Sequence, residues 1–333
     1  MPFSDRSLIF VSITLGGFLF LLSTKCSSSD HELPMGLMPI PKDNPISEEK
    51  VQLGRALFFD KRLSRTNNVS CATCHVPKFA FADRVPISEG VNGGKTMRNT
   101  PSLLNVGYQP TYMFDAHIPS LEQQVIVPIQ EHQEMDMKMG ELIEKLRSIP
   151  SYRDQAKKIF GRDFDAYVLT RSISAFERTL ISQNSRFDQY MKGDKKALSS
   201  EEIKGYKLFS QKLYCTTCHS YPNFTSHKAE NNGLYADYNE DKGRFRIHND
   251  SSDIGKFKVP SLRNIELSFP YMHDGSFWTL DEVLDHYASG GKNPLNQHYV
   301  IKPFNLSETE KKQLISFLKS LTDTSYLVDF RDF

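Results

Sequence analysis

Apolar side chains recur at the spacing of an α-helix in several separate parts of this chain, whereas runs that alternate apolar and polar residues are few and short. The clearest amphipathic helices are expected at 165–181 and 306–321. The second of these begins at a capping box, in which Ser307 precedes Glu310 by three residues. The pattern predicts a mainly α-helical protein with long irregular loops and little β structure.

Two further helices are expected to begin at Ser47 and at a second capping box, formed by Ser199 and Glu202. Both contain the pattern G-x-x-L-F, which starts at Gly54 in the first helix and at Gly205 in the second. A helix with this pattern therefore stands near the beginning, and an amphipathic helix near the end, of two successive parts of the chain. This order indicates an internal duplication.

The charge balance excludes one class of partner, and the N-terminus indicates export. The 333 residues include 41 Lys and Arg against 40 Asp and Glu. Because there is no strong basic field, nucleic acid is not expected as a partner. Arg6 precedes an uncharged, mostly apolar run from Leu8 to Leu22, which is typical of a secretory signal. We predict a signal peptide at 1–25.

Cys26 follows this apolar run and is itself followed by the polar stretch "SSSD". The arrangement resembles a bacterial lipoprotein signal, with Cys26 as the lipidated first residue and 26–46 as a flexible tether. An uncleaved membrane anchor is the alternative. In both cases we expect an exported or periplasmic protein that meets the membrane only through its N-terminal lipid or anchor.

The remaining four cysteines fall in two C-x-x-C-H motifs, "CATCH" at 71–75 and "CTTCH" at 215–219. This is the attachment motif of c-type haem, in which the cysteines form thioethers and the histidine ligates the iron. A zinc site or a redox pair would leave the histidine after each pair without a role. We predict two covalent haems, attached at Cys71, Cys74, Cys215 and Cys218, with His75 and His219 as axial ligands.

The haem motifs complete the duplication. A helix before C-x-x-C-H and another at the end of the unit is the plan of a cytochrome c. We therefore expect two tandem cytochrome c-like domains, 47–195 and 196–333, each with one haem. The boundary is placed near "MKGDKKALSS", which is charged and poor in apolar residues.

Longer motifs carry a resemblance to a known family. The stretches "LGRALFFDKRLSRTNNVSCATCH", "RNTPSLLNVGYQPTYMFD", "DKGRFRI" and "FKVPSLRNIELSFPYMHDG" resemble the bacterial di-haem cytochrome c peroxidase / MauG family over 47–322. The resemblance implies that the first haem reacts with hydrogen peroxide. It implies that the second haem passes electrons from a small cytochrome c or copper protein, and it allows a homodimer, as many relatives form.

The resemblance also assigns residues at the peroxidatic haem. The family places a glutamate and a glutamine beside that iron, and the matching residues, counted from Pro128, are Glu134 and Gln124. An acid–base group is needed there to move a proton while the O–O bond breaks. Some members hold a histidine over this iron, and the matching residue here is Val91, which cannot ligate iron. The first haem is therefore expected to be accessible to peroxide in the oxidised protein.

The family carries one calcium ion between its haems, bound by neutral oxygen atoms and water. The matching residues are Asn99 for the side-chain oxygen and Ser268 and Pro270 for two backbone carbonyls. The family usually also has a tryptophan between the haems, where this chain has Phe114. Phenylalanine is much harder to oxidise, so an electron route through that side chain is not expected.

The ligand over the second iron depends on the stretch "LDEVLDHYASGGK". In the peroxidase branch a methionine ligand lies fourteen residues after the histidine of the "HDG" motif, and fourteen after His273 is Tyr287. The MauG branch uses tyrosine at this position. Tyr287 is therefore the predicted ligand, with Met272 as the runner-up and His286 as a further candidate. The alternative is that Tyr287 packs with the leucines of its helix.

Three functions remain open. The first is a cytochrome-c peroxidase that reduces hydrogen peroxide to water. The second is a MauG-like oxidase that modifies side chains of a partner protein through high-valent haem. Tyr287 and Val91 favour it, but MauG passes its oxidising equivalents through a tryptophan where this chain has Leu213, next to Tyr214. The third is a non-catalytic di-haem electron carrier, for which Glu134 would have no use.

Overall fold

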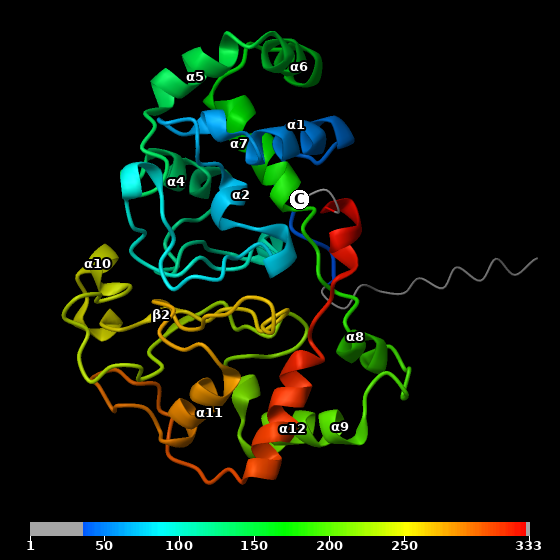
Figure 1. Cartoon of the computed structure of the whole chain (residues 1–333), viewed down its shortest axis with the longest axis vertical. Coiled ribbons are helices and arrows are strands. Elements are labelled where there is room, and N and C mark those ends of the chain that lie inside the picture. Colours follow the sequence, from blue (N-terminus) through cyan, green and yellow to red (C-terminus); the bar gives the residue numbers. More distant parts are fainter. Residues whose placement is uncertain (1–35, 331–333) are drawn as a thin grey trace, which may run out of the picture. The chain divides into compact units, whose positions relative to one another are not determined.

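The computed structural model describes residues 36–330 (Figure 1). The expected signal peptide, Cys26 and the first part of the expected tether lie outside this range. By their contacts, the described residues all belong to one unit of the chain. None of the helices in 36–330 combines the length and the apolar character needed to cross a membrane.

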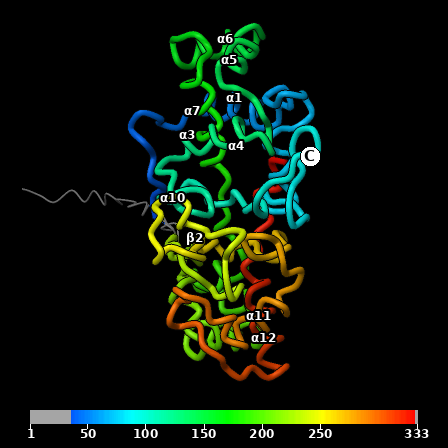
Figure 2. Tube along the Cα trace, turned by 90° about the vertical axis from the view of Figure 1, so that its left-hand side faces the viewer, coloured from blue at the N-terminus to red at the C-terminus, as the bar shows by residue number. Residues whose placement is uncertain are grey.

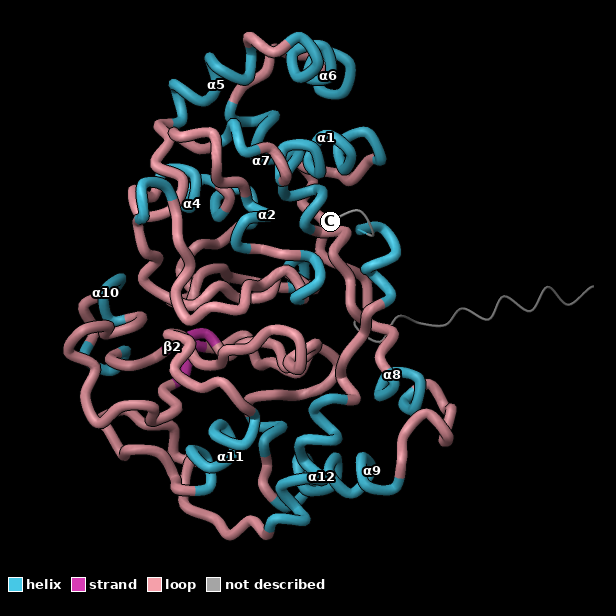
Figure 3. Tube along the Cα trace, viewed as in Figure 1, coloured by secondary structure: helices cyan, strands magenta, loops and turns pink. Residues whose placement is uncertain are grey.

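Helices and loops make up nearly all of the described chain, so the predicted mainly α fold is confirmed (Figure 3). Two short antiparallel strands, β1 (Ala229–Glu230) and β2 (Phe257–Lys258), pair Ala229 with Lys258. The α-helices are α1 (Glu48–Phe58), α2 (Cys71–Cys74), α3 (Leu121–Gln124), α4 (Ile126–Gln130), α5 (Met139–Arg147), α6 (Pro150–Phe160), α7 (Ala166–Glu177), α8 (Arg186–Met191), α9 (Ser200–Lys207), α10 (Phe245–His248), α11 (Leu280–Ala288) and α12 (Glu308–Lys319).

The predicted helix starts are confirmed. Ser47 caps α1, and its side chain accepts a hydrogen bond from the Lys50 backbone. The capping boxes at Ser199 and Ser307 are both formed at the starts of α9 and α12. Each cap satisfies backbone N–H groups that have no partner in the first turn of a helix. These local signals therefore set where the long helices begin.

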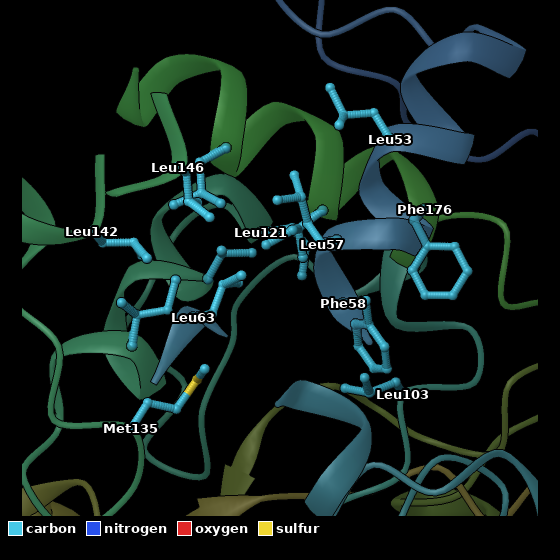
Figure 4. Close-up of a cluster of buried hydrophobic side chains, with 14 of the residues drawn as sticks. Leu53, Leu57, Phe58, Leu63, Leu103, Leu121, Met135, Leu142, Leu146 and Phe176 are labelled. Carbon is cyan, nitrogen blue, oxygen red and sulfur yellow. The ribbon is translucent and has the colours of Figure 1, made fainter. Parts of the chain in front are cut away.

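The G-x-x-L-F pattern is explained by two matching helix pairs. α1 packs along α7, and α9 packs along α12. A Cβ atom on Gly54 would lie 1.9 Å from the Ser172 carbonyl oxygen, and one on Gly205 would lie 2.0 Å from that of Gln313. Only glycine allows the helices to approach this closely. Figure 4 shows the α1 side chains that follow Gly54 on the side of α7, where Leu57 and Phe58 lie near Phe176.

Each helix pair has its own hydrophobic core. The first is built from α1, α3–α7 and the loops around the first haem motif, and the second from α8, α9, α11, α12 and the second motif. After α12 the chain returns to the first core through a 3₁₀ segment, Ser325–Phe330 (Figures 1 and 2). Phe330 lies 5.1 Å from Phe81, measured between ring centroids, and the Tyr326 hydroxyl donates to the Pro77 carbonyl at 3.0 Å.

Polar contacts join the two haem-bearing halves. The Arg98 guanidinium forms ion pairs with Asp115, at 2.8 Å, and with Asp241, at 2.6 Å. Asp115 also pairs with Arg246 at 2.6 Å. Arg98 and Asp115 belong to the first half and the other two to the second. These ion pairs therefore hold loops of the first half against loops of the second half, in addition to packing.

Candidate haem and peroxide site

The first haem motif forms a short helix, α2, with His75 as its C-cap. The Nδ1 atom of His75 lies 2.8 Å from the Phe81 carbonyl oxygen. Burial lowers the pKa of His75, although this hydrogen bond acts in the opposite direction. A neutral imidazole that donates through Nδ1 has its lone pair on Nε2, which is the form that binds a metal. The ring is therefore oriented as an axial ligand of haem iron requires.

The second motif repeats this arrangement. The Nδ1 atom of His219 lies 2.9 Å from the Phe224 carbonyl oxygen, and burial lowers the pKa of His219 as well. Phe81 and Phe224 both adopt positive φ, 56° and 50°, which turns each chain back toward its histidine. Two histidines from separate parts of the chain thus have the same support.

The four cysteines form no disulfide. Burial raises the pKa of Cys74 to about 11 and that of Cys215 to about 12, so both are neutral thiols at pH 7. Within 36–330 no group of three or more His, Cys, Asp or Glu could hold a metal ion. The arrangement of the cysteines and histidines fits two covalent c-type haems.

Val91 and Glu134, which were predicted to face the first iron, lie next to each other. The Val91 backbone N–H donates to the Glu134 carbonyl at 2.8 Å. A Cβ atom on Gly90 would lie 2.1 Å from the Gln133 carbonyl oxygen, so the loop needs glycine to come this close. Val91 is buried, with only 2 % of its surface exposed.

The environment of Glu134 suits proton transfer near neutral pH. Burial raises the pKa of Glu134 to about 7, and the nearby charge of Glu131 adds to this increase. The Glu134 charge also raises the pKa of both Cys71 and Cys74, which places the carboxyl close to the first haem motif. A carboxyl whose pKa lies near the working pH both accepts and donates protons efficiently.

Gln124 lies at the end of α3, where its amide nitrogen is 3.9 Å from the Met113 sulfur. No hydrogen bond between Gln124 and Glu134 is formed. The helix is held by Glu122, whose carboxylate receives hydrogen bonds from Arg178 at 2.6 Å and Asn44 at 2.7 Å. Gln124 therefore lies on a helix, α3, that the buried Arg178–Glu122 ion pair holds in place, and its side chain is next to Met113.

Tyr287 lies on α11 and is partly buried near the second haem motif. Burial raises the pKa of Tyr287 to about 12, and a hydrogen bond with the Asn232 side chain opposes this increase. Ligation of iron by this phenol requires loss of its proton, as metal binding generally does. Tyr287 also interacts with the Cys215 and Cys218 thiol groups, so it lies near the second haem motif.

The two other candidate ligands of the second iron, Met272 and His286, both contact Asn232. The Asn232 amide nitrogen lies 3.3 Å from the Met272 sulfur, and its carbonyl oxygen lies 3.0 Å from His286 Nε2. Sequence reasoning missed Asn232, because a single asparagine in a loop has no periodic or motif signal. Its side chain and backbone tie Tyr287, Met272 and His286 together.

The side chain of Asn99, a predicted calcium ligand, is held by two backbone carbonyls. The Asn99 amide nitrogen donates to the Val85 carbonyl at 3.0 Å and to the Pro86 carbonyl at 3.2 Å. These two bonds use the donor end of the amide, so Oδ1 is the end that is available to a cation. The Asn99 backbone N–H donates to the His273 carbonyl at 2.8 Å, which places it beside the segment that contains Ser268 and Pro270.

Two C-x-x-C-H motifs, each with two free cysteines and a half-buried histidine whose Nδ1 faces a backbone carbonyl, are typical of a di-haem c-type cytochrome. The model of the family described as di-haem cytochrome c peroxidase matches residues 48–196. The methylamine utilization protein MauG of Methylorubrum extorquens is 38% identical, over 85% of this chain and 81% of its own. The cytochrome c551 peroxidase of Nitrosomonas europaea is 34% identical, over 86% and 84%. This chain belongs to the di-haem cytochrome c peroxidase / MauG family.

The fold agrees with solved structures. The crystal structure of a MauG-like protein associated with microbial copper homeostasis has a TM-score of 0.83 and 34% identity, over 89% of this chain and 95% of its own. The di-haem peroxidase BthA from Burkholderia thailandensis has a TM-score of 0.73 at 21% identity, which shows a shared fold. Two c-type haems, predicted from the motifs, are the cofactors of this family.

Proposed function

We propose that this protein is a di-haem c-type peroxidase that reduces hydrogen peroxide to water with electrons from a small redox protein. The observation that carries the proposal is the position of Glu134. It is a partly buried carboxyl with a pKa raised to about 7, held against Val91 and close to the cysteines of the first haem motif. An electron carrier has no need of such a group beside its haem.

The haems, when bound, supply the iron and the two electrons that reduce peroxide. Glu134 accepts a proton from one peroxide oxygen and returns it to the other, which leaves as water. Gln124 orients the peroxide through its amide. Val91 offers no lone pair, so it leaves room for the substrate, and its burial limits the entry of other ligands. Two protons from solvent complete the conversion of one peroxide and two electrons into two waters.

The second half serves electron entry. His219 would ligate the iron of the second haem, and Tyr287 is proposed as a further ligand of the same iron. Tyr214, immediately before Cys215, is 64% exposed, which supports contact between this edge of the protein and a small cytochrome c or copper protein. We further propose one calcium ion at Asn99, Ser268 and Pro270. Export to the periplasm, with a lipid at Cys26, completes the proposal.

One observation favours a second function, the oxidation of side chains on a partner protein. Tyr287 lies near the second haem motif, at the position where the peroxidase branch has a methionine. A methionine thioether would stabilise reduced iron. A phenolate is a harder, anionic donor and favours oxidised iron. The similarity to the methylamine utilization protein MauG extends over most of this chain. In this alternative Tyr214, not Leu213, is the oxidisable residue on the path outward.

Steady-state kinetics of the holoprotein distinguish the two functions. Peroxide consumption is measured with a reduced small cytochrome c or copper protein as the only electron source. The proposal predicts two equivalents of donor oxidised for each peroxide consumed, with turnover that saturates in both substrates. Peroxide consumption that does not oxidise the donor, accompanied by cross-linking or oxidation of an added protein, would support the MauG-like function instead.

A further inference from the structure

One arginine joins the first haem segment to the second half of the protein. The Arg84 guanidinium carbon lies 4.1 Å from the centroid of the Phe79 ring and 4.5 Å from that of the Phe269 ring. Phe79 follows the first haem motif by four residues, in a 3₁₀ turn (Pro77–Phe79). Phe269 lies between Ser268 and Pro270. Arg84 is thus in contact with the segment that bears both proposed carbonyl ligands of calcium.

The charge of Arg84 has no acidic partner among residues 36–330. Its Nε atom is buried and makes no hydrogen bond within that part of the chain. An arginine that contacts two aromatic rings through cation–π interactions loses much of its freedom, because both contacts hold the same guanidinium group. The side chain therefore links Phe79 to Phe269.

The two residues after Arg84 orient the third proposed ligand. The Asn99 amide nitrogen donates hydrogen bonds to the carbonyls of Val85 and Pro86, at 3.0 and 3.2 Å. Both of these hydrogen bonds use Nδ2 of Asn99, so within 36–330 they leave its Oδ1 available to a cation. Pro86 also lies against Gly275, where an added Cβ atom would come within 2.5 Å of the Pro86 Cα atom. Residues 84–86 thus contact both sides of the proposed site.

We propose that residues 84–86 form a clamp that positions the oxygen donors of the cation site between the haems, with Arg84 as the positioning residue that sets its affinity. The inference rests on the calcium site of the proposed function. Because the three donors are neutral oxygens, the protein supplies no carboxylate charge to compensate for poor geometry. Fixing their positions before the ion arrives lowers the ordering cost of binding.

The positive charge of Arg84 acts in the opposite direction, since it repels a cation. The two effects are separable by substitution. Arg84→Met removes both the charge and the planar group, whereas Arg84→Lys keeps the charge and loses the plane. If positioning dominates, both variants bind calcium more weakly. If repulsion dominates, Arg84→Met binds calcium more tightly and Arg84→Lys is unchanged.

The experiment is calorimetric titration of calcium into the di-haem protein after removal of the ion by a chelator. We expect about tenfold weaker binding, or about 1.4 kcal/mol, in Arg84→Met and Arg84→Lys, and a similar loss in Phe269→Leu. The matched control is Arg162→Met, because Arg162 stacks at 4.8 Å on Tyr167 in an exposed loop before α7. This variant should bind calcium as the parent protein does.

Melting of the calcium-free proteins and spectra of both haems provide the second measurement. The clamp predicts parent-like melting without calcium, and altered haem spectra that saturating calcium restores. A loss that calcium does not restore would contradict the clamp and indicate a general structural role. If the parent binds calcium and the Arg84 variants match it, the clamp is wrong but the site stands. If the parent binds none, the site itself fails, and the clamp fails with it.

Discussion

His75 and His219 are supported in the same way, but the residues that face them differ. Both histidines direct Nδ1 to a carbonyl of a phenylalanine with positive φ. Val91 and Glu134 contact each other near the first motif, whereas Tyr287 lies near the second. The duplicated framework therefore supports a histidine in the same way in each half. In the proposed function, these few side chains account for the different roles of the two haems.

The residue before each first cysteine also differs. Ser70 is 4% exposed and adopts extended φ, −127°, while it caps α2. Tyr214 is 64% exposed and adopts φ 52°. The residue before the first haem motif is thus buried, whereas the residue before the second places an aromatic ring at the surface. An exposed aromatic ring beside a haem motif suits the exchange of electrons with another protein.

A third difference concerns stability. The stretches "PSLLN" and "PSLRN" correspond in the two halves, so Leu104 is matched by Arg263. Leu104 is buried among apolar side chains. Arg263 is equally buried but forms two hydrogen bonds with Asp188, at 2.7 and 2.8 Å. One position in the duplicated framework is therefore apolar in the first half and occupied by an ion pair in the second.

The largest expected effect is at Glu134. Glu134→Gln keeps the shape of the side chain but cannot accept a proton, so the reaction with peroxide should slow by about 10²–10⁴-fold with both haems retained. In the parent, the rate should rise as pH increases through about 7, because the carboxylate is the proton acceptor and its pKa lies there. The variant should lose this dependence. Stopped-flow mixing with peroxide at several pH values measures both.

The control for this prediction is Glu131→Gln. Glu131 is exposed and raises the pKa of Glu134 only through its charge. Its removal should move the midpoint of the pH profile to lower pH and leave the maximal rate unchanged. Equal rates in Glu134→Gln and the parent would remove Glu134 from the mechanism.

The next largest effect concerns the ion pair that distinguishes the second half. Asp188→Asn leaves the Arg263 charge buried without compensation and should lower the free energy of unfolding by about 3–5 kcal/mol. Asp194→Asn, whose exposed carboxylate only accepts from the Lys196 backbone, should change it by less than about 0.5 kcal/mol. Denaturant unfolding of the holoprotein provides the comparison, and equal stability of the two variants would refute it.

The same pair predicts a pH dependence. Burial disfavours the charged form of Asp188, but Arg263 outweighs it and holds the pKa below the ordinary value of 3.8. A lowered pKa means that the stabilisation is present above 3.8 and is lost as pH falls through the folded-state value. Asp188→Asn should therefore remove part of the acid sensitivity. Unfolding curves at decreasing pH, compared with the parent, test this.

A smaller and more local effect is expected at Tyr287. Tyr287→Phe should change the absorption and electron paramagnetic resonance spectra of the second haem. It should also raise the reduction potential of that haem, because an anionic ligand is removed. The first haem should be unaffected. The control is Tyr238→Phe, since the Tyr238 hydroxyl is also buried in this half but donates to Asn231 at 3.0 Å. Identical spectra for Tyr287→Phe and the parent would show that Tyr287 is not a haem ligand and instead packs with the leucines of α11.

Local signals in the sequence predicted the helices well. The capping boxes at Ser199 and Ser307 mark real helix starts, because a cap depends only on neighbouring residues. The repeated G-x-x-L-F pattern indicated the duplication, and the structure explains it by two close helix contacts at Gly54 and Gly205. The haem cysteines and histidines were likewise readable from their spacing. These features share a short separation along the chain.

Features that depend on distant contacts were not predictable. Tyr326 and Phe330 pack into the first core although they follow the last helix of the second half, and apolar periodicity does not say which core a segment joins. Asn232 organises three candidate ligands from a loop without any motif. The stacking of Arg84 on Phe269 joins residues far apart in the sequence. Only the folded structure brings these groups together.

The most direct test of the central claim is stopped-flow spectroscopy of the fully oxidised protein mixed with peroxide in the absence of reductant. The claim is that the first site is open because Val91 takes the place of a ligand, and that Glu134 beside it moves the proton. It predicts spectral changes at the haems within milliseconds in the parent, and much slower changes in Glu134→Gln. A parent that does not react until one electron has been added would contradict the claim, because a side chain would then cover the first iron.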